Sequence, residues 1–297
     1  MQAEFDFEEI KEIVHLAIKE DIGDGDITSK IFIPEGSESE GTIIVKETGI
    51  VAGLPVAGYV LSQLDKDLIF TSNIEDGSRV ERGTEIARVK GLTISLLSAE
   101  RVVLNFIQRL SGIATATNRF AEKVKGYKAQ IMDTRKTVPG WRYLEKYAVR
   151  VGGGVNHRMG LYDHILIKDN HLKIMEYEKE NGAIVRLVKK ARKQIENGTL
   201  IEVEVEDLSQ VKDTADAGVD IILFDNMEPS KIREAVNMVK EYERNQGART
   251  GKAILTEASG NITLQNVEEY AKAGVDRISV GAITHSARAL DISFEIS

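Results

Sequence analysis

The order of hydrophobic and polar positions divides this chain of 297 residues into two parts. In the first part, apolar residues at helical spacing predict an amphipathic helix over residues 6–20. Runs rich in β-branched residues and punctuated by glycine predict strands within 40–52 and 67–90. Ser98 then precedes a long helical stripe, so we expect it to cap a helix over about 98–125. This part predicts a small sheet with helices packed on it.

From residue 129 onward, short apolar runs are each followed by polar or small residues. The runs cover 129–132, 165–167, 200–205, 221–224, 253–255 and 277–280. Helical patterns at about 182–197, 207–217, 229–244 and 263–273 lie between most of them. Strand, polar end and helix in repetition are typical of a (β/α) barrel, whose active site lies at the carboxyl ends of the strands. An open, doubly wound sheet is the alternative, and its ligands bind at the same ends.

An internal repeat supports the barrel. The segments DLSQVKDTADAGVDIILFDN and TLQNVEEYAKAGVDRISVGA align helix with helix and strand with strand, and both carry Ala-Gly-Val-Asp just before the strand. Repeated βα units are what such a barrel is built from. Only five or six strands stand out in the pattern, so we expect the barrel to be incomplete.

Composition excludes several classes of protein. The formal net charge of −8 argues against general binding to nucleic acid or to a membrane surface. The absence of cysteine excludes disulfides, thiolate metal sites and a cysteine nucleophile. The acidic start of the chain does not resemble a signal peptide, and no apolar run approaches the ~18 residues of a membrane span. A cytoplasmic protein is therefore expected.

Cations gather between Asp133 and His171, although the protein is acidic overall. The first apolar run of the second part leads to Arg135-Lys136, three glycines precede His157-Arg158, and the next run leads to Lys168. Several cations beside glycine-rich backbone at strand ends suit a ligand with several negative charges. A Schiff-base role for Lys168 is the alternative, and the further cations favour an anion ligand instead.

Carboxylates occupy the next strand ends. Strand alternation places Glu202, Glu204 and Glu206 on one face, which either meets solvent at an exposed edge or lines a polar interior. The cations and Asp225 on other strands favour the interior. From the residues alone, Glu204 and Asp225 are candidates for binding ribose hydroxyls and Mg²⁺.

Small residues after the last two strands predict a phosphate site. They are Ser259-Gly260-Asn261 and Val280-Gly281-Ala282, with Thr284 and His285 as further donors. Tight turns alone would also explain these small residues. Arg101 in the first turn of the long helix opposes the helix dipole, which marks it as a functional candidate or as a surface arginine beside Glu100. His15 and His164 have no companions in the sequence, so we interpret both as structural.

At this point the motifs resemble a known family, quinolinate phosphoribosyltransferase. They are EDIGDGDIT, AERVVLNFIQRLSGIAT, DTRKTVPGWR, GGGVNHRMGLYDHILIKDNH, EVEVE, LFDNM, EASGNIT and SVGAITHS, in this order along almost the whole chain. The resemblance implies an α/β sandwich over residues 1–115, completed by 285–297, and an open α/β barrel over 116–284.

The resemblance also implies an activity. Quinolinate and phosphoribosyl pyrophosphate would react with Mg²⁺ to give nicotinate mononucleotide, pyrophosphate and CO₂, in de novo NAD biosynthesis. Glu204 and Asp225 would face the ribose and the metal, directly or through water, and Lys136 would lie between substrate and pyrophosphate. The two turns would hold the 5′-phosphate, and Thr137 and His285 would complete the substrate site. The carboxylates of quinolinate would be held by Arg135, His157, Arg158 and Lys168.

The resemblance further implies a homodimer or a higher oligomer, in which Arg101 reaches the site of a neighbouring subunit. One departure is visible, because the family usually has glycine where this chain has Asn261. Asn tolerates left-handed backbone angles, so we expect the turn to survive. Three rivals stay open: a paralogue of the same fold found with molybdenum-transport genes, a nicotinate-specific phosphoribosyltransferase, and a non-catalytic module suggested by the carrier-like segment DGSRVERGTEIARVKG.

Overall fold

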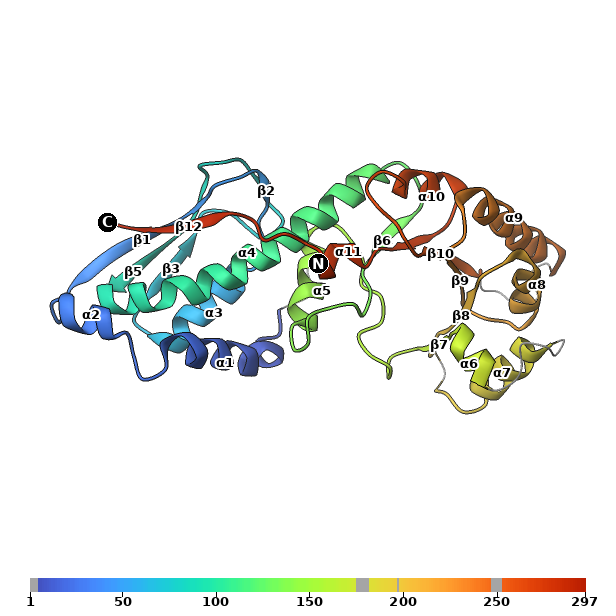
Figure 1. Cartoon of the computed structure of the whole chain (residues 1–297), viewed down its shortest axis with the longest axis horizontal. Helices are drawn as coiled ribbons and strands as arrows, with labels where there is room; N and C mark the ends of the chain where they lie inside the picture. Colours follow the sequence, from blue (N-terminus) through green and yellow to red (C-terminus); the bar gives the residue numbers. More distant parts are fainter. Residues whose placement is uncertain (1–4, 175–181, 197, 247–252) are drawn as a thin grey trace. The chain divides into compact units, whose positions relative to one another are not determined.

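The computed structural model describes residues 5–174, 182–196, 198–246 and 253–297, and the chain forms two compact units (Figure 1). The first unit contains residues 1–118, 136–154 and 283–297, and the second contains 119–135 and 155–282. The predicted division differs from this one chiefly in its treatment of residues 136–154, which it assigned to the barrel, and also at residues 116–118 and 283–284. In the structure, Glu145 from this segment is fully buried and forms an ion pair with Arg109 of the first unit, 2.6 Å apart.

The first unit is an antiparallel sheet with helices packed on it (Figure 1). The sheet has the order β12-β1-β5-β3, so the end of the chain pairs with β1, as the resemblance implied. The elements are η1 (Glu8–Ile10), α1 (Lys11–Ile22), α2 (Ile27–Phe32), β1 (Glu38–Val45), β2 (Gly49–Ile50), α3 (Leu54–Leu64), β3 (Ile69–Ser72), β4 (Arg79–Val80), β5 (Glu85–Leu92), α4 (Thr93–Lys123), α5 (Arg142–Val151), α11 (Ala282–His285) and β12 (Ile292–Ile296).

The long helix α4 begins at Thr93, so the predicted cap at Ser98 is wrong. Its apolar stripe starts earlier than the pattern suggested, because Leu96 is fully buried together with Val103 and Leu110. Strand β5 ends at Leu92 and the helix follows without a loop. Arg101 therefore lies well inside the helix, and the argument from an unfavourable dipole contact does not apply to it.

The second unit is a sheet of six parallel strands in the order β6-β11-β10-β9-β8-β7. The strands β6 and β7 form its two edges, so the predicted barrel is present and is open. The elements are β6 (Gln130–Met132), β7 (Ile165–Ile167), α6 (Asp169–Ile174), α7 (Ala183–Arg192), β8 (Ile201–Val205), α8 (Leu208–Asp216), β9 (Ile221–Asp225), α9 (Pro229–Gln246), β10 (Leu255–Ser259), α10 (Val267–Ala273) and β11 (Arg277–Ser279).

The internal repeat corresponds to two βα units of this sheet, α8–β9 and α10–β11. Helices α7 to α10 pack side by side in chain order (Figure 1). The helix predicted over 182–197 is observed as the shorter α7, and the last residue of that prediction, Asn197, lies outside the described residues. Within the described part of the chain, the helices are too short or too polar to cross a membrane.

Candidate active site

The parallel sheet brings the predicted strand-end residues of the second unit to one edge. Asp225 ends β9, Ser259 ends β10, Lys168 follows β7, and Glu204 is the fourth residue of β8. Because the six strands are parallel, their carboxyl ends point the same way, which is where ligands bind in such sheets. Arg135 and the turn that starts at Val280 follow β6 and β11 at the same edge.

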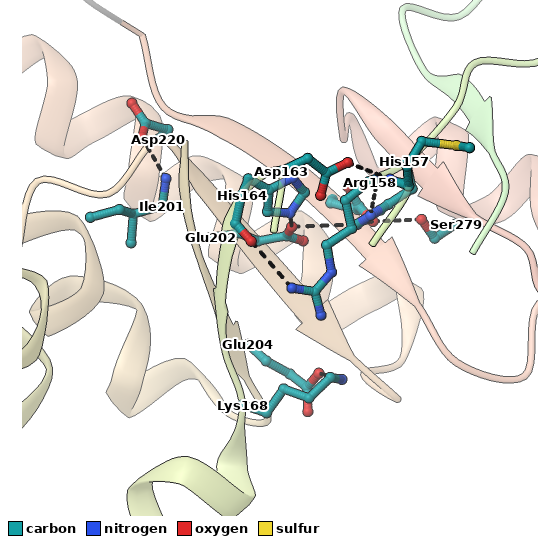
Figure 2. Close-up of polar contacts among 12 residues, drawn as sticks. His157, Arg158, Asp163, His164, Lys168, Ile201, Glu202, Glu204, Asp220 and Ser279 are labelled. Atoms are coloured by element: carbon teal, nitrogen blue, oxygen red, sulfur yellow. Dashed lines mark hydrogen bonds and ion pairs between the residues drawn. The ribbon is translucent and has the colours of Figure 1, made fainter. Parts of the chain in front are cut away.

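Lys168 and Glu204 form the most direct contact at this edge (Figure 2). The Nζ of Lys168 lies 2.6 Å from Oε2 of Glu204, and the Lys168 side chain is 43% exposed while that of Glu204 is 7% exposed. Burial raises the pKa of Glu204, the negative charges of Asp225 and Asp169 add to this, and Lys168 opposes it. Glu204 and Asp225 are thus close enough to repel each other, which favours a cation or hydroxyl donors between them.

Two guanidinium groups also approach each other. Burial lowers the pKa of Arg158, and the positive charge of Arg135 lowers it further. The Nη1 of Arg158 donates to the carbonyl of His164 over 3.3 Å. Like charges at short range in a partly buried site repel unless an anion lies between them. The pair therefore suits a ligand with more than one carboxylate.

His157 lies behind these cations and is almost fully buried, with 8% of its side chain exposed. Asp133 holds it in place, because the carboxylate accepts the backbone N–H of His157 over 2.9 Å and the Asn156 amide over 2.6 Å. The Nε2 of His157 faces two buried carboxylates, Glu202 at 3.3 Å and Glu257 at 3.4 Å.

His164 shares one of these carboxylates, so the interpretation that it has no companions is wrong (Figure 2). Its Nε2 lies 2.9 Å from Oε2 of Glu202, and its ring centroid is 5.2 Å from that of His157. Burial raises the pKa of Glu202, but hydrogen bonds from the two histidines outweigh burial and the net pKa is lowered. His15, by contrast, is exposed and contacts Gln63 at 3.1 Å.

The triad of β8 carboxylates divides in the structure. Glu202 is 0% exposed and Glu204 is nearly buried, so the predicted polar interior is confirmed for both. Glu206 follows the last residue of β8 and is exposed. It faces solvent because the chain leaves the sheet there and begins the turn into α8.

The cluster of His157, His164 and Glu202 resembles a metal site, since its three ligand atoms lie within 4.8 Å of one another. The hydrogen bonds argue against a metal. Nδ1 of His157 accepts the backbone N–H of Arg158 over 2.8 Å, so a neutral ring carries its proton on Nε2. The lone pair that a metal needs on Nε2 is then occupied. Glu204 and Asp225 keep the hard oxygen ligands that suit Mg²⁺.

The turn after β10 has the backbone geometry expected of a close approach to a ligand. Gly260 has φ of 98° and Asn261 has φ of 51°, both in the left-handed region. A Cβ on Gly260 would lie 2.2 Å from Oδ1 of Asn226, so only glycine fits. Asn261 tolerates the angle, as predicted, and its Nδ2 donates to Oδ1 of Asn226 over 3.1 Å.

The turn after β11 is adjacent, because Ser279 pairs with Ser259 across the two strands. The backbone N–H of Val280 donates to the carbonyl of Met132 over 2.9 Å. Val280 therefore offers no spare backbone donor to a phosphate. Any backbone donor that this turn offers to a phosphate must come from Gly281 or Ala282, which follow Val280.

Five of the predicted site residues belong to the first unit. Arg101 has a 57% exposed side chain, with Nη2 lying 3.9 Å from Glu100, as the surface interpretation expected. The carbonyl of Lys136 accepts from the hydroxyl of Thr284 over 2.8 Å, and the hydroxyl of Thr137 accepts from Arg142 over 3.0 Å. His285 contacts the hydroxyl of Ser286 through Nδ1, 2.6 Å away.

Sequence reasoning missed Glu257 and Ser279. The hydroxyl of Ser279 donates to Oε1 of Glu257 over 2.5 Å, and both side chains are buried. The available signal was a single charged residue in the middle of an otherwise apolar or small strand, which is costly unless it has partners.

Two family models match the chain. The C-terminal domain of quinolinate phosphoribosyl transferase matches residues 113–295, and the N-terminal domain matches 26–111. A probable nicotinate-nucleotide pyrophosphorylase [carboxylating] of Bacillus subtilis is 42% identical over 97% of this chain and 94% of its own length. The nicotinate-nucleotide pyrophosphorylase [carboxylating] of Mycobacterium leprae is 39% identical over the whole of both chains.

Solved structures agree. The nicotinate-nucleotide pyrophosphorylase of Francisella tularensis superposes with a TM-score of 0.88 and 38% identity, over 99% of this chain and 98% of that one. Both domains, nearly the full length and the fold are thus shared with these proteins. The chain belongs to the quinolinate phosphoribosyltransferase family.

Proposed function

We propose that this protein is a carboxylating nicotinate-nucleotide pyrophosphorylase of de novo NAD biosynthesis. It transfers the phosphoribosyl group of phosphoribosyl pyrophosphate to quinolinate and releases pyrophosphate and CO₂. The observation that carries the proposal is the composition of one sheet edge. There the cations Arg135, Arg158 and Lys168 follow strands whose neighbours carry the carboxylates Glu204 and Asp225.

The cations define the acceptor. Quinolinate carries two adjacent carboxylates, and nicotinate carries one. The mutual repulsion of Arg135 and Arg158 is relieved best by a ligand that offers an anion to each. Lys168 adds a third positive charge that Glu204 orients. A doubled set of cations therefore favours the dicarboxylate.

The carboxylates serve the sugar. Glu204 and Asp225 accept hydrogen bonds from ribose hydroxyls and supply oxygen ligands, directly or through water, to a Mg²⁺ ion bound with the pyrophosphate. That ion would neutralise charge on the leaving group. Ser259, Gly260 and Asn261 hold the 5′-phosphate together with Gly281 and Ala282, in the position where barrels commonly bind phosphate.

The remaining chemistry needs little acid–base help. The leaving pyrophosphate gathers negative charge, which Lys136 stabilises. Once N1 of quinolinate carries the ribose, the positively charged ring can accept the electron pair left when CO₂ departs from C2. The protein has only to hold the dicarboxylate in line with the sugar and to keep its cations in place.

We also propose that the active enzyme is a cytoplasmic homodimer or higher oligomer in which Arg101 serves the neighbouring site. Its high exposure within one chain supports this role. Mixing Arg101→Ala protein with Lys168→Ala protein tests it, because a mixed dimer then contains one intact site. Partial recovery of activity is expected, and a mixture no more active than its components contradicts the sharing.

The function itself is tested by product analysis. Purified protein with Mg²⁺, phosphoribosyl pyrophosphate and quinolinate should form nicotinate mononucleotide, pyrophosphate and CO₂ in equal amounts. Pyrophosphate released without CO₂ would show that a different acceptor chemistry is in use.

A further inference from the structure

Arg109, in the middle of helix α4, joins three segments of the first unit through its guanidinium (Figure 1). Nη2 donates to Oε1 of Glu145 on α5 over 2.6 Å and to the carbonyl of Thr284 on α11 over 2.8 Å, and Nη1 donates to the carbonyl of Ala287 over 3.1 Å. The planar guanidinium presents its donors in a fixed fork, so these acceptors are held in one arrangement. Arg109 and Glu145 together form an ion-pair hub.

Glu145 extends the hub to the chain that follows β6. Its side chain is fully buried, and its Oε2 accepts the backbone N–H of Val138 over 3.3 Å. Thr284 makes a second connection to the same chain, because its buried hydroxyl donates to the carbonyl of Lys136 over 2.8 Å. The hub therefore holds the backbone of residues 136–138 at two points.

The two segments that the hub holds follow directly on proposed site residues. Lys136 is the neighbour of Arg135 in the chain, and Thr284 lies two residues after Ala282, the last of the proposed phosphate-binding residues. The boundaries between the two units lie at these same places, after residue 135 and after residue 282. The hub thus fixes the backbone where the chain leaves two parts of the proposed active site.

The segment after α11 also lies very close to α4. A Cβ at Gly112, one turn beyond Arg109, would overlap the carbonyl oxygen of Arg288. Further along the same segment, the amide of Gln108 donates to the carbonyl of Ile292 over 2.7 Å. The segment is therefore held on α4 at several points, and Arg109 holds the end that is nearest in sequence to the proposed site.

Stability alone does not require this ion pair. Taking a carboxylate out of water is costly, and two apolar side chains of similar volume often stabilise a protein as well as a buried ion pair does, or better. An apolar pair cannot, however, form hydrogen bonds with the main chain of Val138 and Thr284. The distinctive contribution of the hub is therefore to the position of these two stretches of backbone.

We propose that Arg109 and Glu145 are positioning residues that hold Lys136 in place for the pyrophosphate group. In the proposed mechanism, Lys136 acts when the leaving group gathers negative charge, so a displaced ammonium slows that step. A misplacement of about 1 Å can reduce a rate by about 10²-fold. This inference rests on the proposed function, since it assigns Lys136 to the pyrophosphate.

The variant Arg109→Lys keeps a positive charge beside Glu145 and loses the fork. A single ammonium cannot reproduce the spread of the guanidinium donors. We expect kcat with quinolinate to fall by about 10²-fold. The Kd for quinolinate, measured by calorimetry without phosphoribosyl pyrophosphate, should change by less than about twofold, because other cations hold the dicarboxylate. A kcat close to that of the wild type overturns the inference.

Gln108→Met is the matched control. It removes the hydrogen bond from α4 to the carbonyl of Ile292 and leaves the hub in place. Gln108→Met and Arg109→Lys should both unfold at a lower temperature, because each weakens the attachment of the same segment to the same helix. In Gln108→Met, however, kcat should stay near the wild-type value. An equal loss of kcat in the two variants contradicts positioning by the hub.

An apolar replacement of the whole pair separates positioning from stability. Arg109→Met alone leaves the buried carboxylate of Glu145 uncompensated and should destabilise the fold strongly. Adding Glu145→Leu removes that carboxylate, so the unfolding temperature should recover toward the wild-type value. In the double variant kcat should stay low, because Val138 and Thr284 have lost their hydrogen bonds to the hub. Recovery of kcat together with stability overturns the inference.

A second readout does not depend on turnover of quinolinate. Inorganic pyrophosphate with Mg²⁺ should bind about tenfold more weakly to Arg109→Lys than to the wild type, as expected when a contact with a charged group is weakened. Equal affinities for pyrophosphate contradict the inference, whichever acceptor the enzyme uses. A wild-type protein that binds pyrophosphate but does not consume quinolinate contradicts the proposed function instead. Failure of the wild type to bind pyrophosphate contradicts both.

Discussion

The two edges of the parallel sheet use the same residue types in opposite ways. At the amino edge, Asp220 precedes β9 and Asp276 precedes β11, each as the last residue of the repeated Ala-Gly-Val-Asp. Asp220 accepts the backbone N–H of Ile201 over 2.7 Å (Figure 2). It also accepts a hydrogen bond from the guanidinium of Arg192 over 2.5 Å. Asp276 accepts the N–H of Thr256 over 2.9 Å and Lys128 over 2.8 Å.

The acids inside the sheet and toward its carboxyl edge are incompletely satisfied. Glu202, the second residue of β8, and Glu257, the third residue of β10, each keep one buried oxygen without a partner in the described structure. Glu204, nearer the carboxyl edge, has a raised pKa. Acids at the amino edge take part in closed networks that tie neighbouring strands together. The acids farther along the strands are not fully compensated by the protein's own groups in the described structure. Asp220, Glu202 and Glu257 are all buried. The number of hydrogen-bond partners therefore distinguishes a stabilising carboxylate from a functional one better than burial does.

The largest effects should follow from removing a cation at the carboxyl edge. Lys168→Ala and Arg135→Ala should each reduce kcat/KM for quinolinate by a factor that corresponds to about 2–5 kcal/mol. Steady-state kinetics and thermal unfolding together check this, because the fold should remain intact. Lys173→Ala is the matched control. Lys173 is exposed, its Nζ lies 2.7 Å from Asp169, and its loss should change kcat/KM little. Unchanged kinetics in Lys168→Ala would show that Lys168 does not belong to the active site.

At the amino edge the same kind of change should act on stability. Asp220→Ala leaves the fully buried N–H of Ile201 without its acceptor, which costs about 1–3 kcal/mol of unfolding free energy. Denaturant titration measures this, and KM for quinolinate should stay constant. Asp213→Ala, at an exposed position of α8, provides the control. A large rise in KM for Asp220→Ala without loss of stability would contradict a purely stabilising role for the amino edge.

The turn after β10 should respond to backbone geometry more than to side-chain contacts. Asn261→Gly loses the bond to Asn226 but suits φ of 51°, so stability should change by less than about 1 kcal/mol. Asn261→Val places a β-branched residue at the same angle and should cost about 1–2 kcal/mol. It should also raise KM for phosphoribosyl pyrophosphate. Equal effects in the two variants would show that the left-handed angle is unimportant.

The smallest effect concerns acid stability. Burial raises the pKa of Asp276, but hydrogen bonds from Lys128 and Thr256 outweigh burial and the net pKa is lowered. A folded-state pKa below the unfolded value contributes stability at neutral pH, and this contribution is lost as pH falls through the acidic range. The unfolding free energy of Asp276→Asn should therefore decline less between pH 6 and 3 than that of the wild type. If the unfolding free energies of the two proteins fell equally with pH, Asp276 would not contribute to the loss of stability in acid.

Much of the fold follows from local pattern. The apolar runs and helical stripes predicted the six parallel strands and helices α7 to α10, because each βα unit carries its own periodicity. The start of α4 was misplaced because Ser98 resembles a cap, whereas the buried Leu96 continues the helix upstream. Because the apolar stripe of α4 follows directly on strand β5, no polar loop marks the start of the helix in the sequence.

The site was predictable where residues lie at strand ends and less so where they meet only in space. Lys168 and Glu204 occupy such positions, and the structure brings the two side chains into contact. The contact between His164 and Glu202 joins the residue before β7 to a residue of β8 and depends on the register of β7 against β8. The sequence spacing of the histidines does not predict that register. The Arg158 bond to Nδ1 of His157 depends likewise on local backbone geometry.

The most direct test of the account is a competition between quinolinate and nicotinate for the carboxyl edge. Both are supplied with Mg²⁺ and phosphoribosyl pyrophosphate, and the ratio of their kcat/KM values is measured. The cation set at Arg135, Arg158 and Lys168 predicts that quinolinate is consumed with release of CO₂ while nicotinate is left untouched. Consumption of nicotinate at a comparable rate would contradict the assignment of these cations to two carboxylates.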